Sequence, residues 1–473
     1  MPHSWKARGA AACAVAIVLV FGLGVRAAQP QADARLAGAY RKPAENGWIF
    51  VHLQGTPAQV GYQHGYLLAQ EIADTLAVVR LESDHDNHRD WPFFRDAAQK
   101  MMWPKIDPEY REELQGIADG ARAKGVALDV WDITALNAFL EWPYYVKELD
   151  KAKGKTEGLP AIPERCSAFV ATGSYTAGGK VVIAHNNWSS YLEGARWTIV
   201  FDVAPASGHR FIMDGLPGLI HSGDDFSIND AGIAITETTI SQFSGFDPAG
   251  IPEFARARKA TQYSASIDDF ARIMKEGNNG GYANDWLVAD TRRNEIAHLE
   301  LGLKNVTLER TTDGYFVGSN FPKNEKLIRE ETDFDPKDLS NSANARHARW
   351  EQLMAENKGR IDLAAAQRFE SDHYDSFQKK DEPNERSLCG HIDRSPRGSQ
   401  PWMGPYGLAG TVQNKAADAA MIAKLTLTAA AGHACGIGFK AAEHLAAHAD
   451  DAWQQALLRD IPAGAWTTFT AAK

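Results

Sequence analysis

The sequence predicts an α+β fold in which antiparallel sheets are covered by helices, and it does so through two contrasting halves. From about Gly55 to Leu149, apolar residues recur at helical spacing. After Cys166, short alternating or β-branched runs follow one another with glycine-rich turns, and helical segments separate groups of these runs. The 473 residues, 44% hydrophobic and 23% charged, predict two or three globular domains, or one large domain with insertions.

Residues 1–27 are predicted to be a secretory signal peptide. Lys6 and Arg8 precede an uncharged, mostly apolar run from Gly9 to Val25, and small residues then suit cleavage after Ala27. An N-terminal membrane anchor is the alternative, which the short run and the cleavage site disfavour. We therefore expect a secreted or periplasmic protein without a stable membrane span.

Residues 28–149 are predicted to form a mostly helical segment. Ala58–Leu81 carries apolar residues at roughly helical spacing. Asp107 as N-cap and Pro108 at the first helical position mark the start of another helix. Lys, Gly, Glu and Pro then crowd into residues 150–165, which is typical of an exposed linker.

Residues 166–473 form the second predicted domain, which begins as a series of short strands. The expected strands are Ser167–Thr172, Lys180–His185, Trp197–Val203, His209–Asp214, Ile228–Thr239, Trp286–Asp290, Glu295–Leu301 and Tyr315–Gly318. Helices are expected at Ile267–Glu276, Asn344–Glu356 and Leu363–Phe369.

Charge and motifs exclude several classes of function. A net charge of -10 disfavours general binding to nucleic acid. The sequence contains no G-x-S-x-G, H-E-x-x-H, P-loop or strand-to-helix G-x-G-x-x-G motif. Ser83–His88 and His433–Cys435 hold metal-ligand types, but adjacent ligands rarely converge without a partner from elsewhere. We therefore expect no metal and no organic cofactor.

The cysteines are few and odd in number. Cys13 leaves with the signal peptide, so Cys166, Cys389 and Cys435 remain. One disulfide plus one free thiol is the simplest arrangement in an exported protein. A Cys389–Cys435 bridge would leave Cys166 free, although the sequence does not determine this pairing.

Cys166 lies at the junction between the linker and the first strand. Cleavage of the chain there would expose a thiol and an α-amine on one residue. A free α-amine has a pKa of about 7.7–8, so it can act as the base that activates the thiol without any histidine. The alternative is a small buried apolar residue at the start of a strand. The residues alone leave both interpretations open.

Ordered motifs around Cys166 resemble those of the phospholipase B-like proteins. These belong to the cysteine N-terminal nucleophile (Ntn) hydrolases, as do penicillin acyltransferases, acid ceramidase and bile-salt hydrolases. The resemblance extends from about Gly55 to the C-terminus. The motifs are Cys166–Ala168, Gly178–Trp188, Ser222–Phe226, Gly232–Ile240, Gly281–Trp286, Gly318–Pro322 and Ser342–Arg346. This resemblance implies a four-layer αββα sandwich with Cys166 as the nucleophile.

The resemblance also implies roles for residues far from Cys166 in the sequence. Asn320 matches the asparagine whose amide helps to form an oxyanion hole, and Thr239 lies near the position of a second donor. Arg346 matches the arginine that orients the nucleophile, although Arg349 is close enough to compete. We expect Cys166, Asn320 and Arg346 to converge.

One departure separates this sequence from the amide-cleaving relatives, which carry Gly-Arg-Asn-x-Asp after the second strand. Here His185 replaces the arginine and Trp188 replaces the aspartate, as in the phospholipase B-like branch. That aspartate contacts the α-amine, so Asp225 or Glu237 is expected to hold the amine instead. His185 is included as a candidate catalytic residue.

The resemblance implies substrate-binding residues as well. These are Asn186, Trp188, Asp225, Glu237 and Trp286. We also expect the aromatic rings of Trp188, Phe226, Trp286 and Phe321 to line an apolar groove for an acyl chain.

The predicted function is that of an exported zymogen that cleaves itself between Arg165 and Cys166 and then hydrolyses an acyl ester or amide. The two fragments are expected to remain associated as a heterodimer. The favoured reaction is deacylation of a lipid of the phospholipase B-like type. An N-acyl amidase or acyltransferase acting on a small molecule and a non-catalytic binding protein of the cell envelope are the alternatives.

Overall fold

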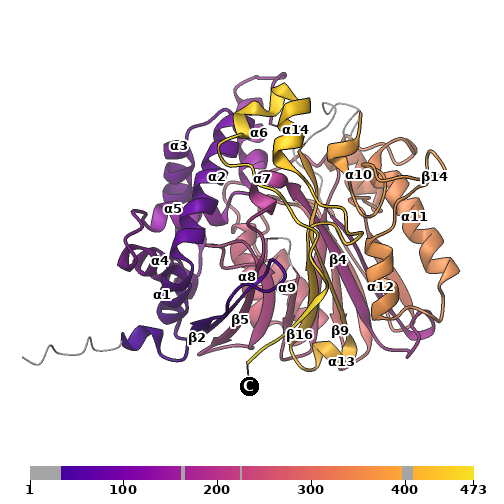
Figure 1. Cartoon of the computed structure of the whole chain (residues 1–473), viewed down its shortest axis with the longest axis horizontal. Coiled ribbons are helices and arrows are strands. Elements are labelled where there is room, and N and C mark those ends of the chain that lie inside the picture. The colour runs from indigo at the N-terminus through magenta and orange to yellow at the C-terminus, as the bar shows by residue number, and fades with distance from the viewer. Residues whose placement is uncertain (1–32, 161–165, 224–225, 397–407, 473) are drawn as a thin grey trace, which may run out of the picture. The chain divides into compact units, whose positions relative to one another are not determined.

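Two β-sheets stacked face to face form the centre of the fold (Figure 1). The chain divides into two units, residues 1–34 and 35–473, and the fold below is that of the second unit. The predicted signal peptide, residues 1–27, lies outside the described residues. The structure is a computed structural model that describes residues 33–160, 166–223, 226–396 and 408–472.

The larger sheet has nine strands among the described residues. In spatial order they are β1 (Tyr40–Arg41), β2 (Ile49–Gly55), β5 (Ile199–Pro205), β6 (Phe211–Gly215), β7 (Ser227–Asn229), β8 (Ile233–Thr239), β9 (Asn284–Asp290), β10 (Glu295–Leu301) and β11 (Val306–Thr311). Neighbours are antiparallel except β2 and β5, which run parallel with Ile49 opposite Ile199.

The smaller sheet has six antiparallel strands among the described residues. In spatial order they are β12 (Gly314–Gly318), β3 (Ser167–Thr172), β4 (Val182–Ser190), β15 (Ala409–Asp418), β16 (Thr426–Ala431) and β17 (Thr467–Thr470). A separate short hairpin consists of β13 (Tyr374–Asp375) and β14 (Lys380–Asp381).

The inner faces of the two sheets pack against each other. Ala168 and Val170 of β3 share a buried cluster with Val200 of β5 and Leu287 of β9. Phe169, which lies between the two β3 residues, belongs to a different cluster on the outer face. This alternation is the period of two of a β-strand with both faces buried.

Helices cover the outer face of each sheet. Trp350 and Phe369 pack against the smaller sheet, and Phe270 packs against the larger one. The four-layer αββα sandwich is therefore confirmed by the packing itself. The covering helices are α8 (Glu253–Tyr263) and α9 (Ile267–Lys275) on the larger sheet, and α11 (Ser342–Glu356) and α12 (Leu363–Glu370) on the smaller one.

The helices that precede β3 pack on the outer face of β2, β5 and β6, through residues such as Val51, Phe201 and Met213 (Figure 1). The run Ala58–Leu81, which has apolar residues at helical spacing, lies in two helices that meet at Leu68. These helices are α1 (Pro57–Leu67), α2 (Ala69–Asn87), α3 (Trp91–Ala97), α4 (Pro108–Ala123), α5 (Val130–Asn137) and α6 (Trp142–Ala152).

Local sequence explains where two of these helices begin. Thr56 and Gln59 form a reciprocal capping box ahead of α1, which has Pro57 at its first position. Pro108 likewise begins α4, as expected, but the Asp107 side chain makes no capping hydrogen bond. Its carboxylate instead lies 2.9 Å from the Lys259 ammonium.

Helices α1 and α4 approach each other closely because glycines face each other. A Cβ atom added at Gly61 would lie 2.0 Å from the Glu113 carbonyl oxygen, and one added at Gly65 would lie 2.0 Å from the Ile117 carbonyl oxygen. Gly120 of α4 is equally close to the α1 backbone. The contact therefore excludes any larger side chain at these positions.

Some strand predictions needed correction. The run Ile228–Thr239 is not one strand, because a turn with Gly232 at φ +81° divides it into β7 and β8. Eight of the described strands were not predicted from the sequence, namely β1, β2, β11, β13, β14, β15, β16 and β17. The remaining short helices are α7 (Tyr191–Gly194), α10 (Glu325–Glu331), α13 (Ala419–Ile422) and α14 (Ala441–Ala447).

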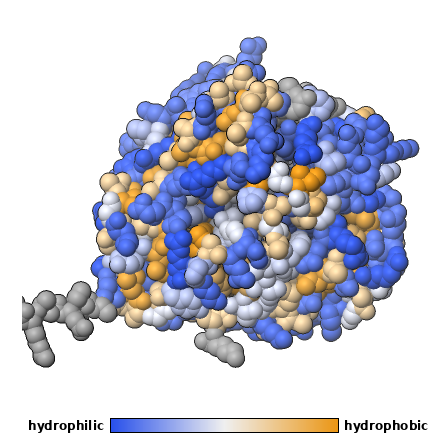
Figure 2. Space-filling model, in the orientation of Figure 1, coloured by the Kyte–Doolittle hydropathy of each residue, from blue (hydrophilic) through white to orange (hydrophobic). Residues whose placement is uncertain are grey.

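Hydrophilic residues predominate on the face shown in Figure 2, with hydrophobic residues in small groups among them. In the part of the chain that the structure describes, no helix has the length and apolar character needed to cross a bilayer.

Candidate active site

Cys166 is fully buried immediately before β3. Its backbone has φ +84°, in a region that residues other than glycine rarely adopt. Such a conformation costs on the order of 1–3 kcal/mol and is often found at functional sites. Arg165 and residues 161–164 lie outside the described residues, whereas residues 151–158 of the predicted linker are exposed.

The Cys166 sulfur lies among buried polar side chains. It is 3.9 Å from Oδ1 of Asn187 and 4.0 Å from Oε1 of Glu237, two oxygens that can accept a hydrogen bond from the thiol. The Tyr282 hydroxyl donates to the same Glu237 oxygen at 3.0 Å. A ring nitrogen of His185 lies within 4.8 Å of both the sulfur and a Glu237 carboxylate oxygen. A thiol, an imidazole and a carboxylate are thus gathered in one buried place.

Arg346 of α11 holds the backbone around Cys166. Its guanidinium donates to the Cys166 carbonyl oxygen at 2.6 Å and to the Ser167 hydroxyl at 3.0 Å. A further N–H reaches Oδ1 of Asn320 at 2.7 Å. The side chain is 1% exposed, so these charge-assisted hydrogen bonds are shielded from water. Arg349, the competing candidate, instead pairs with Asp372 at 2.6 Å.

Hydrogen bonds at both the oxygen and the nitrogen of its amide orient the Asn320 side chain. Because its oxygen accepts from Arg346, its amide nitrogen points the other way and donates to the Thr239 backbone carbonyl at 2.7 Å. The backbone of Asn320 has φ +66°. Thr239 is also buried, and it contacts Asn320 through its main chain rather than its hydroxyl. The structure therefore brings Cys166, Arg346 and Asn320 together.

Asn186 and Trp188 lie on the outer face of β4, away from the thiol. The Asn186 amide donates to the carbonyls of Glu370 and Leu388, which fastens the chain after α12 to the sheet. Burial raises the pKa of Glu370 well above its usual range. The Trp188 ring lies under the Arg346 guanidinium, 4.2 Å from centroid to carbon. Both residues therefore support the site from the outer face of the smaller sheet.

The four aromatic residues expected to line a groove lie in different parts of the fold. Phe226 is in the core between the sheets, whereas Trp286 packs on Phe270 of α9 at the outer face of the larger sheet. Phe321 stacks on His347, with ring centroids 4.2 Å apart. The four rings therefore line no common groove among the described residues, which corrects the groove hypothesis, whereas the substrate-binding role of Trp286 stays a prediction. Asp225 lies outside the described residues.

Sequence reasoning missed several polar residues between the sheets. Asn187 was passed over in favour of Asn186, although alternation from the inward-facing Ile183 predicts that Asn187 points inward. The Lys415 ammonium is fully buried 3.4 Å from the Asp214 carboxylate, which also accepts from Gln413 at 2.7 Å. Lys415 lies opposite His185 in the sheet, so these polar groups adjoin the residues around Cys166.

The described cysteines, Cys166, Cys389 and Cys435, form no disulfide. The bridge considered between Cys389 and Cys435 is therefore absent, although the two thiols lie within 4.8 Å of each other.

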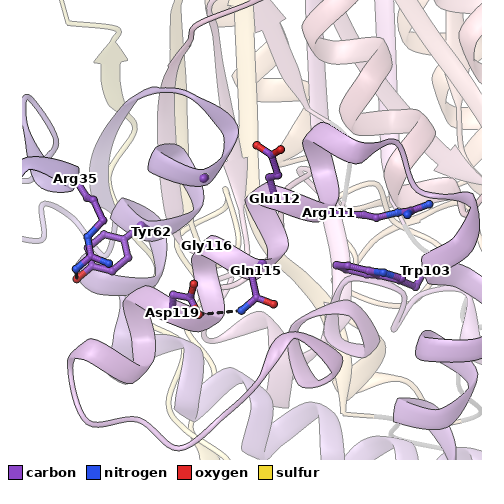
Figure 3. Close-up of a pocket in the computed structure, with 9 residues that line it drawn as sticks. Arg35, Tyr62, Trp103, Arg111, Glu112, Gln115, Gly116 and Asp119 are labelled. Carbon is purple, nitrogen blue, oxygen red and sulfur yellow. Dashed lines mark hydrogen bonds between the residues drawn. The ribbon is translucent and has the colours of Figure 1, made fainter.

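A cavity of about 370 Å³ lies elsewhere, between α1, α4 and neighbouring residues (Figure 3). Trp103 and Arg111 are among its lining residues, and so are Gln115 and Asp119, which form a hydrogen bond of 2.9 Å from the Gln115 amide to the Asp119 carboxylate. None of its lining residues belongs to the group around Cys166.

Comparison with known proteins points to one family. The sequence model of the Phospholipase B family matches residues 94–311, which include Cys166. An uncharacterized protein from Archaeoglobus fulgidus is 26% identical, over 53% of this chain and 42% of that protein. Putative phospholipase B-like 2 from Mus musculus is 28% identical, over 31% of this chain and 27% of that protein. Phospholipase B-like 1 from Bos taurus is 21% identical, over 56% of each chain.

These matches span about half, or less, of the length of most of these relatives. A crystal structure of a mutant conjugated bile acid hydrolase from Clostridium perfringens covers 56% of this chain and 89% of its own, with 9% identity. Its TM-score of 0.34 is too low to support a conclusion. Together with the ordered motifs, the sequence matches show that this chain is similar to the phospholipase B-like proteins over part of its length.

Proposed function

We propose that this chain is an exported acyl hydrolase of the N-terminal nucleophile type, with Cys166 as the nucleophile. The proposal rests on the environment and backbone conformation of Cys166. It is buried, has an unusual backbone conformation, and is held at its carbonyl by Arg346. A purely structural cysteine is buried as well, but it needs neither the positive φ nor a guanidinium bound to its carbonyl.

Self-cleavage comes first in the proposed mechanism. The Cys166 thiol attacks the Arg165 carbonyl carbon, and the peptide nitrogen takes up a proton as the C–N bond breaks, which leaves a thioester. Water then hydrolyses the thioester, giving the Arg165 carboxylate and a free α-amine on Cys166. The positive φ of Cys166 supports this step, because cleavage would release the backbone from a costly conformation.

The new α-amine then serves as general base for the thiol beside it. The thiolate attacks the acyl carbon of the substrate, the leaving group departs, and water hydrolyses the acyl thioester. We assign the Asn320 amide to the oxyanion and Arg346 to positioning, because Arg346 sets the direction of that amide. Glu237 is the proposed partner of the ammonium form of the α-amine, since its carboxylate oxygen is 4.0 Å from the sulfur.

Similarity to phospholipase B-like proteins favours a lipid ester as substrate, although the corrected aromatic groove no longer supports a long acyl chain. Kinetic assays should compare long-chain acyl esters, long-chain acyl amides and short polar amides. A preference for lipid esters supports deacylation, whereas a preference for short polar amides supports the amidase or acyltransferase alternative. Absence of turnover from correctly cleaved protein would support the binding-protein alternative.

The proposal is tested by the chain start of the purified protein. Wild-type protein should yield Cys166 as a new N-terminus and two associated fragments of roughly 15 and 34 kDa, scaled from 51.8 kDa over 473 residues. Cys166→Ala should remain one chain and be inactive, whereas Cys166→Ser should cleave slowly because a hydroxyl is the weaker nucleophile. An uncleaved wild-type protein that still hydrolyses substrate would overturn the free-amine mechanism and direct attention to His185.

A further inference from the structure

Four side chains of metal-ligand type converge beside the loop that follows the β13–β14 hairpin. They are His373, Cys389, His391 and Cys435, and their ligand atoms all lie within 4.8 Å of one another. The group comprises two thiols and two imidazoles. Cys389 and His391 are fully buried, whereas His373 and Cys435 are partly exposed.

The four residues come from three separate parts of the chain, and main-chain hydrogen bonds hold them together. The Cys389 N–H donates to the carbonyl of Asp372, the neighbour of His373, at 3.0 Å. The His391 N–H donates to the Asn384 carbonyl at 3.0 Å. Cys435 lies in the turn after β16. The backbone thus places these side chains together without a disulfide.

The spacing of the side chains agrees with a tetrahedral ion. The Cys435 sulfur is 3.5 Å from Nε2 of His391. With Zn–S near 2.3 Å and Zn–N near 2.05 Å, tetrahedral coordination requires a sulfur-to-nitrogen separation of about 3.5 Å. A disulfide between the two cysteines would instead need a sulfur-to-sulfur distance of about 2.05 Å, and no bridge is formed.

We propose that His373, Cys389, His391 and Cys435 bind one Zn²⁺ ion in a closed, structural site. Two thiolates balance the charge of the ion, which removes the cost of burying an uncompensated charge. Binding releases the two thiol protons to solvent. Four protein ligands leave no position for a substrate or an activated water, so the site stabilises the fold and takes no part in the acyl transfer.

Polar neighbours around His391 fit the outer layer of such a site. The His433 ring stacks on the His391 ring, with centroids 3.9 Å apart and planes within 3°. Nε2 of His433 is in turn 3.1 Å from the Gly390 carbonyl oxygen and 3.3 Å from the Tyr191 hydroxyl. The Tyr191 hydroxyl also donates to Asp393 at 2.9 Å. The hydrogen bonds of His433 thus hold the ring on which His391 stacks.

The proposed ion would stabilise the candidate active site through Gly390, the residue between the zinc ligands Cys389 and His391. A Cβ atom at Gly390 would lie 2.1 Å from Cε2 of Trp188, so the loop rests directly on that ring. The same Trp188 ring lies under the Arg346 guanidinium. Fixing Cys389 and His391 therefore fixes the surface against which Arg346 is packed.

The test is the metal content of the full-length protein, purified without chelators from cells supplied with zinc. Elemental analysis should give about one zinc ion per chain. Removal of zinc with a chelator should lower the melting temperature, and added Zn²⁺ should restore it. Co²⁺ in its place should give the intense visible absorption and thiolate charge transfer of a tetrahedral thiolate site.

Matched variants locate the ion. Cys435→Ser and His373→Gln should each lose most of the zinc, whereas Cys166→Ala should retain it. Zinc that is lost from Cys166→Ala but retained by Cys435→Ser would place the metal at the Cys166, His185 and Glu237 group and overturn the assignment. A wild-type protein that binds no zinc even when reduced, or one that carries a Cys389–Cys435 disulfide by mass spectrometry, would also overturn it. These results do not depend on hydrolase activity.

Discussion

Replacing Arg346 by lysine should separate the positioning of the nucleophile from the presence of a positive charge. The guanidinium donates hydrogen bonds to Ser342 at 3.0 Å, the Cys166 carbonyl at 2.6 Å, Ser167 at 3.0 Å and Asn320 at 2.7 Å. Lysine keeps the charge, but its single ammonium cannot span the Cys166 carbonyl and the Asn320 amide together.

The expected magnitude follows from the acceptors that lose their donor. Each buried acceptor left unsatisfied costs about 1–3 kcal/mol, so Arg346→Lys should lose about 2–4 kcal/mol of unfolding free energy. The larger effect should be on catalysis. Without Arg346 the Asn320 amide is no longer held in one direction, and loss of an oxyanion donor lowers kcat by about 100-fold or more.

Arg349→Lys is the matched control, because Arg349 lies one turn further along the same helix and pairs with Asp372 instead. It should cost about 1 kcal/mol or less and leave cleavage and turnover unchanged. Chain cleavage is followed by gel electrophoresis, turnover by steady-state kinetics, and stability by denaturant unfolding. If Arg346→Lys cleaves itself and turns over at the wild-type rate, the positioning role is wrong, whatever its stability.

Three further predictions concern the supporting structure. Burial lowers the pKa of His64 to about 3, and its Nε2 accepts from the Gly218 N–H, so the folded state holds it neutral. The neutral His64 ring contributes to the free energy of unfolding above the unfolded pKa, and this contribution is lost as pH falls. The loss is about 2 kcal/mol at pH 5 for an unfolded pKa near 6.5. Urea titrations at pH 7.5 and pH 5 should show a smaller drop in the free energy of unfolding for His64→Gln than for wild-type protein. Gly65→Ala should lower the melting temperature by far more than Gly178→Ala, because a Cβ at Gly65 meets backbone 2.0 Å away and one at Gly178 meets open space. Equal shifts would contradict the close packing of α1 on α4. Gly390→Ala should reduce turnover, because its Cβ would displace Trp188 from beneath Arg346, and wild-type kinetics in this variant would contradict that support.

The sequence by itself identified Cys166 as the candidate nucleophile and predicted most of the local elements around it. Strand β3 has the bounds expected for Ser167–Thr172, and β10 has those expected for Glu295–Leu301. Both are short alternating or β-branched runs between turn residues, which is a local property of the chain. The ordered motifs also identified Asn320 and Arg346 as residues to be considered with Cys166.

Tertiary structure alone decided which residues meet. Strand β2 was missed because its partner β5 lies 150 residues further along, and no local pattern records that pairing. Alternation shows that Asn186 and Asn187 point to opposite faces of β4, but only the second sheet shows which face holds the thiol. The Cys389 and Cys435 thiols were considered as a disulfide pair, yet folding places them with His373 and His391, because long-range contacts depend on how whole layers pack. The sequence of one strand shows that alternate residues share a face. Which of the two faces points to the other sheet depends on how the two sheets pack.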